Sequence, residues 1–386
     1  MSGATELVVR GGRPLRGRLQ MPGDKGMSHR ALLFAAMATG SSRLTNVSRG
    51  DDVRRTAQAL EDLGVRVHAD DKAAMTIEGT GVEGMHEPAG VIDCGNSGTT
   101  IRMLAGLLAG RPFRAVLSGD ASLVTRPMKR LVDPLRAMGA QIECRGEGDV
   151  APLEIRGGHL VGVRCELPVA SAQVKTAVVL AGLQATGDTV VTEPLPSRDH
   201  SERMLAALGA PVQRVDATTL LVHHGAPRPF ELEVPGDASS AAFFAVAAAI
   251  TPGSSIVLEE MGLNPTRIAF VDVLRRMGAP IEVHETGERL GEPVGKLTVE
   301  AAPLHATVIE GAEVPWLIDE IPVLAVAAAF AAGTTEIRDA VELRVKESDR
   351  IGTLHQELTQ MGIEVVAAAD GLAIRGGTPR AATLKS

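Results

Sequence analysis

Five segments of this 386-residue chain repeat one pattern, in which a small, polar, glycine-rich turn runs into an alanine-rich apolar stretch. The five openings are PGDKGMSHRALLFAAMATG from Pro22, GNSGTTIRMLAGLLAG from Gly95, SAQVKTAVVLAGLQATG from Ser171, GDASSAAFFAVAAAITPG from Gly236 and IDEIPVLAVAAAFAAG from Ile318. The copies recur about every 75 residues, which is longer than the usual solenoid repeat. Repetition of this kind predicts one supersecondary unit that is used again and again along the chain.

A second, more charged segment follows each apolar stretch and has apolar residues at helical spacing. We expect amphipathic helices over residues 52–63, 128–138, 201–208, 267–277 and 348–361. Each ends on Leu-Gly or Met-Gly, and these glycines are typical of helix C-caps, since glycine adopts the left-handed conformation without strain. Short β-branched stretches such as 141–144, 189–192 and 364–366 then predict strands. The repeated unit is therefore predicted to be β-α-β-α-β-β.

The alanine-rich helices are apolar nearly all round, as in residues 241–250 and 323–332. A helix that is apolar on every side is normally buried, and these runs fall short of the roughly 20 residues that span a bilayer. We therefore expect a two-domain inverted α/β fold, with buried alanine-rich helices and outer sheets. Crossovers near 19–22 and 231–235 predict a middle domain over residues 21–234 with three units. The other domain would combine residues 1–20 with 235–386 and hold an incomplete set of units.

Composition excludes several function classes. The net charge of −8 argues against a general nucleic-acid binder, which needs a basic face. Three cysteines, Cys94, Cys144 and Cys165, are too few and too scattered to indicate a disulfide framework or a zinc site. The first residues contain no apolar signal region. We accordingly expect a cytoplasmic monomer that acts on small molecules without metal, cofactor, membrane or nucleic acid.

Polar clusters recur at the N-termini of the apolar helices, whereas nucleotide-binding and hydrolase motifs such as GxxxxGK[ST], GxGxxG, HExxH and GxSxG are absent from the sequence. Helix N-termini carry partial positive charge and unpaired N–H groups, so they bind anions. The clusters are Lys25, Ser28, His29 and Arg30; Asn96 to Thr99 with Arg102; Thr125 to Met128; Ser171 to Gln173; Ser197 to His200; Asp319 and Glu320; and Arg344 to Arg350. They predict a substrate with several negative charges.

In order along the chain, eight strings resemble the EPSP synthase (3-phosphoshikimate 1-carboxyvinyltransferase) family, and in particular its bacterial branch with SAQ and KESDR motifs. They are PGDKGMSHR, GNSGTTIR, TRPM, ASAQVKTA, SRDHSERML, GDASSAAFF, LIDEIPVLAVAAAFA and LRVKESDRI. The resemblance runs from Thr5 to the end of the sequence. It implies two domains, each of three β-α-β-α-β-β units. It also implies transfer of the enolpyruvyl group of phosphoenolpyruvate to the 5-hydroxyl of shikimate 3-phosphate, with release of phosphate.

The same resemblance implies two sets of substrate ligands. Shikimate 3-phosphate would be held by Lys25, Gly26, Arg30, Ser171, Ala172, Gln173, Arg198, Asp319 and Lys346. Phosphoenolpyruvate would be held by Lys25, Asn96, Gly98, Arg126, Gln173 and Arg350. Together the substrates carry two phosphates and two carboxylates, and the lysines and arginines of both sets suit these charges. No metal is expected for this reason.

Proton transfer in this reaction needs a carboxylate and a proton donor near one oxygen and one carbon. By resemblance, Asp319 would activate the 5-hydroxyl, and Glu347, helped by Lys25, would serve the methylene carbon. Simpler readings exist for the same residues. Asp319 precedes a helix with Pro322 in its first turn, so we expect it also to act as the N-cap. The pair of Lys346 and Glu347 is also compatible with a solvated helix face.

Two features depart from the family pattern. Gly26 stands where the family has a serine, and loss of that hydroxyl would cost about 0.5–1.5 kcal/mol of substrate binding. The sequence also ends at GLAIRGGTPRAATLKS, before the sixth unit that the family carries, with its D-H-R-I-A-M helix and phosphoenolpyruvate-binding arginine. We expect apolar surface that the missing unit would cover. We also expect shikimate 3-phosphate binding with impaired turnover.

Two alternative functions remain open on the sequence. The first is the enolpyruvyl transferase that acts on UDP-N-acetylglucosamine, a family that places a cysteine in a mobile loop; residues 117–127, the corresponding region here, contain none. The second is a truncated, non-catalytic protein that binds shikimate 3-phosphate, favoured only by the absent sixth unit. Retention of Lys25, Asp319, Glu347 and Arg350 argues against long loss of activity.

Overall fold

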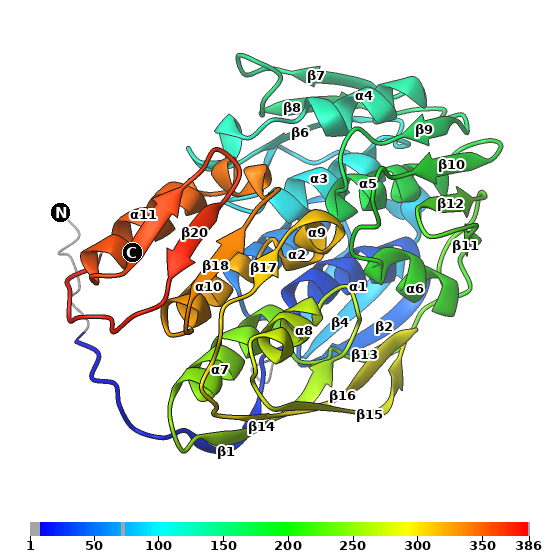
Figure 1. Cartoon of the computed structure of the whole chain (residues 1–386). Helices are drawn as coiled ribbons and strands as arrows, with labels where there is room; N and C mark the ends of the chain where they lie inside the picture. Colours follow the sequence, from blue (N-terminus) through cyan, green and yellow to red (C-terminus); the bar gives the residue numbers. More distant parts are fainter. Residues whose placement is uncertain (1–7, 71–73, 385–386) are drawn as a thin grey trace.

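The computed structural model describes residues 8–70 and 74–384, which form an α/β fold of four-stranded sheets around buried helices (Figure 1). The first helix of each repeat is α1 (Lys25–Met37), α3 (Gly98–Leu108), α5 (Ala172–Gly182), α7 (Ala238–Ile250) or α10 (Ile321–Ala329). The second is α2 (Asp51–Asp62), α4 (Lys129–Ala137), α6 (His200–Ala207), α8 (Ala269–Arg276) or α11 (Arg350–Gln360). Short helices η1 (Val82–Gly84), η2 (Leu123–Thr125), η3 (Gly311–Glu313), α9 (Val314–Leu317) and η4 (Val341–Arg344) lie in the connections. The inverted α/β prediction is confirmed.

Within the described residues, five sheets share one topology, in which a parallel pair is extended by two antiparallel strands. Three sheets are β13 (Glu231–Glu233), β2 (Thr39–Thr45), β4 (Met75–Thr80) and β3 (Arg66–Ala69); β5 (Val91–Asp93), β6 (Arg114–Ser118), β8 (Leu153–Arg156) and β7 (Gln141–Cys144); and β11 (Val212–Arg214), β12 (Thr219–Val222), β10 (Thr189–Thr192) and β9 (Arg164–Glu166). Two more are β1 (Arg16–Gln20), β14 (Ser255–Gly262), β16 (Glu292–Glu300) and β15 (Ile281–Arg289); and β17 (Val308–Ile309), β18 (Thr334–Ile337), β20 (Leu372–Arg375) and β19 (Glu364–Ala367).

The first strands of two repeats are exchanged between distant parts of the chain. β1 does not join the sheet next to α1 but pairs in parallel with β14. β13, which comes after the third repeat, pairs in parallel with β2 and completes the first sheet. The segment 231–235, expected as a crossover, thus includes a strand of the first sheet. The chain therefore passes twice, side by side, between the first three repeats and the last two.

Two hydrophobic cores follow this arrangement. One is built from buried residues between Met27 and Val234, and the other from Met21 and residues between Ala238 and Ile374. The domain boundaries at 20/21 and 234/235 remain a prediction. The five expected helix-end glycines, Gly64, Gly139, Gly209, Gly278 and Gly362, all have φ between 75° and 108°, as the left-handed C-cap requires.

Burial of the apolar helices is nearly complete beyond their first residues in the first core and partial in the second. In α1 every residue from Met27 to Met37 is buried. In α7, by contrast, Phe243 is 58% exposed and Phe244 42%, and at the end of α10 Phe330 is 44% exposed. The expectation of all-round burial is therefore wrong for α7 and for Phe330, which follows α10, whereas no residue of α10 itself is exposed. An apolar helix is more stable when it is buried, but its sequence does not supply the element that would cover each face. No described residue covers the exposed parts of these three phenylalanine rings.

No helix in residues 8–70 and 74–384 is long and apolar enough to cross a membrane.

Candidate active site

The N-termini of the buried helices present their polar clusters to one another. Asp24, Ser97 and Ser171 cap α1, α3 and α5 by accepting hydrogen bonds from Met27 N (2.8 Å), Thr100 N (3.1 Å) and Val174 N (3.5 Å). Side chains then join the helices. Arg102 of α3 donates to Gln173 Oε1 of α5 at 2.7 Å, and Gln173 in turn donates to Thr99 Oγ1 at 2.9 Å.

Asp319 is surrounded by cations from several elements. Its carboxylate lies 2.8 Å from Arg198 NH1, 3.2 Å from Arg350 NH1 and 3.8 Å from Lys346 Nζ. Burial raises the pKa of Asp319, but the charges of Arg198, Lys346 and Arg350 outweigh it and hold the pKa well below the ordinary value. Asp319 is therefore ionised at neutral pH, and the cations that keep it ionised also make it a weaker base than an ordinary carboxylate.

The expected N-cap role of Asp319 is wrong. The N-cap of α10 is Glu320, and no side chain makes a capping hydrogen bond there. The carboxylate of Asp319 points instead to the cations described above. Local sequence predicts the cap, because an acidic residue precedes a proline-containing first turn; the tertiary charges decide the direction of the side chain.

Glu347 connects cations of the two cores. Its carboxylate lies 2.9 Å from Arg350 NH2 and 3.4 Å from Arg126 NH1, and it is half-exposed. Burial raises the pKa of Glu347, but a backbone hydrogen bond and the charges of Arg350 and Arg126 lower it below the ordinary value. Arg126 also donates to Asn96 Oδ1. Glu347 is thus an ionised group between the expected phosphoenolpyruvate ligands.

Lys25 lies at the start of α1, with its side chain half-exposed and its Nζ 2.9 Å from Asp52 Oδ2. Burial lowers the pKa of Lys25, but Asp52, followed by the charges of Asp319 and Glu347, raises it above the ordinary value. Lys25 is consequently a protonated group in the field of both predicted catalytic carboxylates. Burial lowers the pKa of Lys346 below its ordinary value, although Asp319 opposes the shift.

Arg30 is buried, and its donors contact protein groups. It donates to Ser201 Oγ at 2.7 Å, to the Gly26 carbonyl at 3.0 Å and to Thr176 Oγ1 at 3.3 Å. Burial lowers the pKa of Arg30 to about 10, which leaves it protonated at neutral pH. The structure thus places Arg30 against α5 and α6 and ties it to Gly26, the neighbour of Lys25.

The remaining expected ligands lie at two helix N-termini. Ser171 caps α5, the Ala172 carbonyl accepts from Thr176 Oγ1 at 2.6 Å, and Gln173 bridges α5 to α3. Gly98 begins α3, where a Cβ would lie 2.8 Å from Arg102 NH1 and 3.0 Å from Arg126 NH1. The absent side chain therefore leaves the space in which the two guanidinium groups meet.

Structural roles predicted for two histidines agree with their contacts. His29 Nδ1 lies 2.7 Å from Thr56 Oγ1, and His200 Nδ1 lies 2.8 Å from Glu292 Oε1. Both rings are buried.

Two charged residues, Asp52 and Arg267, join the site without having been singled out in the sequence. Arg102, four residues after Gly98 on the same face of α3, was placed in a polar cluster but in neither ligand set. Asp52 pairs with Lys25 only because α1 and α2 pack together, and Arg267 reaches the site from the segment before α8. No local pattern distinguishes the last two.

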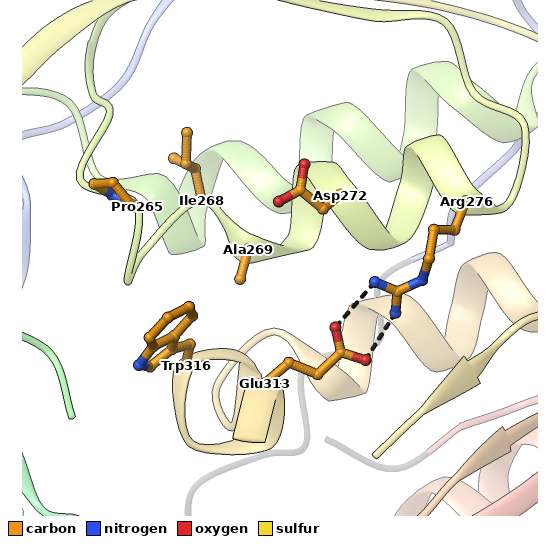
Figure 2. Close-up of a pocket in the computed structure, with 7 residues that line it drawn as sticks. All are labelled: Pro265, Ile268, Ala269, Asp272, Arg276, Glu313 and Trp316. Atoms are coloured by element: carbon orange, nitrogen blue, oxygen red, sulfur yellow. Dashed lines mark hydrogen bonds and ion pairs between the residues drawn. The ribbon is translucent and has the colours of Figure 1, made fainter. Parts of the chain in front are cut away.

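A cavity of about 230 Å³ lies apart from these groups, between α8 and the short helices η3 and α9 (Figure 2). Its lining is Pro265, Ile268, Ala269, Asp272, Arg276, Glu313 and Trp316. Arg276 and Glu313 form an ion pair at 2.7 Å on its wall. The lining contains no predicted site residue, so the candidate active site is the cation cluster rather than this cavity.

Comparison with known proteins agrees with the geometry. The family described as EPSP synthase (3-phosphoshikimate 1-carboxyvinyltransferase) matches residues 9–386. A 3-phosphoshikimate 1-carboxyvinyltransferase of Shouchella clausii is 50% identical over 95% of this chain and 85% of its own length. One of a Synechococcus species is 50% identical over 98% of this chain and 86% of its own length.

Solved structures agree as well. An EPSP synthase from Acinetobacter baumannii has a TM-score of 0.84 and 44% identity, covering 95% of this chain and 83% of that one. The enolpyruvyl transferase NikO from Streptomyces tendae has a TM-score of 0.73 at 19% identity, covering 96% of this chain and 84% of that one, and shows the shared fold alone. The chain belongs to the EPSP synthase family, the 3-phosphoshikimate 1-carboxyvinyltransferases.

Proposed function

We propose that this chain binds shikimate 3-phosphate and phosphoenolpyruvate at the cation cluster around Asp319 and Glu347 and joins them with release of phosphate. The observation that carries the proposal is the pairing of two ionised carboxylates with Arg126, Arg198, Lys346 and Arg350, which come from both cores. These cations offset the charge of two phosphates and two carboxylates. The family membership supports the same reaction.

In the proposed addition step, the 5-hydroxyl oxygen of shikimate 3-phosphate forms a bond to C2 of phosphoenolpyruvate, while the methylene carbon gains a proton. Asp319, which is ionised, is the proposed acceptor of the hydroxyl proton. Lys25, which is protonated, donates the proton that the methylene carbon gains. The product of this step is a tetrahedral adduct that still carries the phosphate.

In the elimination step, the C2–phosphate oxygen bond breaks and a proton leaves the new methyl group, which restores a double bond. Glu347 suits this proton removal, because its low pKa keeps it ionised between Arg126 and Arg350. The phosphate departs among the arginines. Neither step changes an oxidation state. Over the two steps Asp319 and Glu347 gain one proton each and Lys25 loses one; one of the two gained protons leaves with the phosphate and the other restores Lys25, so the protons balance over the cycle.

The proposal is tested by measuring phosphate release from shikimate 3-phosphate plus phosphoenolpyruvate with the purified 386-residue chain. Turnover by the parent, together with a fall of about 10²–10⁴-fold in kcat for Asp319→Asn, is the expected result. Isothermal titration with shikimate 3-phosphate accompanies the assay. Binding without turnover favours the non-catalytic alternative, and absence of both contradicts the proposal.

Turnover with UDP-N-acetylglucosamine in place of shikimate 3-phosphate would favour the other enolpyruvyl transfer reaction. We further propose a cytoplasmic, monomeric enzyme, in line with the expectation from sequence. Light scattering of the purified chain tests the second part, because a dimer would double the 40.3 kDa mass.

A further inference from the structure

Arg267 lies where the N-termini of three buried helices meet. Its guanidinium is 3.2 Å from Asp24 at the N-cap of α1, 3.4 Å from Asp237 at the N-cap of α7 and 3.5 Å from Glu320 at the N-cap of α10. It also donates to Ser239 Oγ at 2.9 Å, and Ser239 donates to Glu320. One cation thus contacts three carboxylates from both cores.

The setting of this cation is buried. Arg267 is 6% exposed, and Glu320 is 1% exposed. A buried charge is retained only when it is paired, and the planar guanidinium can contact several carboxylates at fixed angles where a lysine offers a single point charge. Burial lowers the pKa of Arg267, but Asp24, Glu320 and Asp237 outweigh it and raise the pKa above its ordinary value. Arg267 is therefore charged throughout the working pH range.

The helices that Arg267 joins carry the predicted catalytic groups. Lys25 is the first residue of α1, and its backbone N–H donates to Asp237 Oδ2 at 3.1 Å. Asp319 directly precedes Glu320. Arg198 forms ion pairs with both carboxylates, at 2.8 Å to Asp319 and 3.5 Å to Glu320. The contacts of Arg267 therefore lead to Lys25 in one direction and to Asp319 in the other.

The two chain crossings between the cores lie at the same place. Asp24 N donates to the Pro235 carbonyl at 2.8 Å, and Asp237 N donates to the Pro22 carbonyl at 2.9 Å. Gly23 and Gly236 form the bridge between them. A change in the angle between the cores would bend the chain at these residues, and Arg267 contacts carboxylates on both sides of the crossing.

We propose that Arg267 is a positioning residue that holds Lys25 at a set distance from Asp319 by tying together the N-termini of α1, α7 and α10. This inference rests on the proposed function. Arg267 does not touch the substrates; it acts through Asp24, Asp237 and Glu320. Because catalytic groups displaced by about 1 Å can lose 10²-fold in rate, loosening this junction lowers kcat more than it weakens substrate binding.

The first test compares Arg267→Lys and Ser239→Ala with the parent in the phosphate-release assay. Lysine keeps the charge but not the multiple contacts, and Ser239→Ala removes one link to Glu320 without leaving a charge unpaired. We expect kcat per folded molecule to fall about 10- to 100-fold for Arg267→Lys and less for Ser239→Ala. The KM values for both substrates change less than kcat does.

The matched control is Arg275→Lys on α8. Like Arg267, Arg275 makes more than one contact through its guanidinium: Nε and NH2 both donate to the Ile281 carbonyl, at 3.1 and 2.9 Å. It lies outside the junction of the three helix N-termini. We expect Arg275→Lys to keep the parent kcat. Folded fractions are measured by thermal unfolding for every variant. If Arg267→Lys and Ser239→Ala lose only stability and keep the parent kcat per folded molecule, Arg267 has a structural role alone and the proposal is wrong.

A second readout does not depend on turnover. Amide hydrogen exchange of Met27 and Ser239 reports the caps of α1 and α7, and that of Thr100 reports the separate cap of α3. Arg267→Lys is expected to speed exchange at the first two about 10-fold and to leave Thr100 unchanged. If the parent shows no turnover, the proposed function fails by itself. If hydrogen exchange at Met27 and Ser239 is unchanged in Arg267→Lys, the proposed role of Arg267 is wrong, whatever the activity of the variant.

Discussion

At the residue scale, the site depends on its charged side chains and also on Gly98, which has no side chain. Gly98 begins α3 directly beside the guanidinium groups of Arg102 and Arg126. Arg102 has a pKa lowered to about 10, chiefly by burial and then by the charges of Arg130 and Arg126, so like charges are held close together there. An anion bound between these guanidinium groups would relieve their mutual repulsion. We therefore predict that an anionic group of the substrate binds at this position.

Replacing Gly98 with alanine tests that assignment. The added methyl group would lie 2.8 Å from Arg102 NH1 and 3.0 Å from Arg126 NH1, and both are ends of flexible side chains that can shift. We expect an intact fold and a KM for phosphoenolpyruvate raised about 10-fold or more, since one extra carbon in a fitted site has effects of this size. Steady-state assays of phosphate release at varied phosphoenolpyruvate concentrations measure this KM.

Gly90→Ala is the control for this substitution, because a Cβ there meets nothing within 4 Å. It should leave both KM values unchanged. Equal KM values for Gly98→Ala and the parent would contradict the assignment of this position to the phosphoenolpyruvate site.

At the element scale, the alanine-rich helices have similar sequences but different surroundings. Phe34 of α1 is fully buried, whereas Phe243 of α7 is 58% exposed. Both lie in helices of almost uniform apolar character, so local sequence does not distinguish them. α2, β2 and β4 pack on α1, and Phe34 is fully buried within this packing. For Phe243, no described residue provides an equivalent cover.

A matched pair of substitutions measures this difference. Phe34→Ala should lower the free energy of unfolding by about 3–5 kcal/mol, because it removes a buried ring and leaves a cavity. Phe243→Ala should change it by no more than about 0.5 kcal/mol in this chain, because little burial is lost. Urea unfolding of both variants and the parent gives the comparison. A loss for Phe243→Ala as large as that for Phe34→Ala would show that another group covers α7 in solution.

At the scale of the whole molecule, paired carboxylates hold the two cores together. Burial raises the pKa of Asp24, but Arg267 and then His200 outweigh it and leave the pKa below its ordinary value. The neighbouring cations likewise lower the pKa values of Asp319 and Glu347. Asp237 has the opposite shift, since burial and then the charge of Asp24 raise its pKa. The lowered groups are ionised in the folded protein at pH values where the unfolded chain takes up protons.

Acid should therefore destabilise the fold. A carboxylate with a lowered folded-state pKa stabilises the protein above its unfolded pKa, and this stabilisation is lost as the pH falls towards the folded value. We expect the free energy of unfolding to begin to fall below about pH 6.5, because burial lowers the pKa of His29 to about 3 and only the unfolded chain then takes up this proton. It should fall more steeply below about pH 4, the range where unfolded carboxylates titrate. Protonation of Asp237 opposes this trend in part. Urea unfolding at pH 7, 5, 4 and 3 measures the slope.

Asp24→Asn provides the control for the acid effect. Asparagine also caps helices, so α1 keeps its N-terminal hydrogen bond while the titrating charge is removed. The variant should be less stable than the parent at pH 7 and should lose less stability between pH 5 and 3. The same loss in both proteins would show that Asp24 does not contribute to the acid effect.

The sequence by itself determined the repeated unit, because its signals are local. Each amphipathic segment and its closing glycine specify a helix and its end through contacts within a few residues, and Gly64 and Gly362 adopt the expected left-handed conformation. The order of the polar motifs likewise indicated the family. Their placement at helix N-termini followed from the same local pattern.

Only the tertiary structure decided which distant parts meet. The exchange of β1 and β13 between sheets, the pairing of Lys25 with Asp52, and the reach of Arg267 to three helix N-termini join residues far apart in the chain. The direction of Asp319 also depended on cations from other repeats rather than on its own helix. Electrostatic and strand-pairing partners are chosen by packing in space, and no spacing along the sequence encodes them.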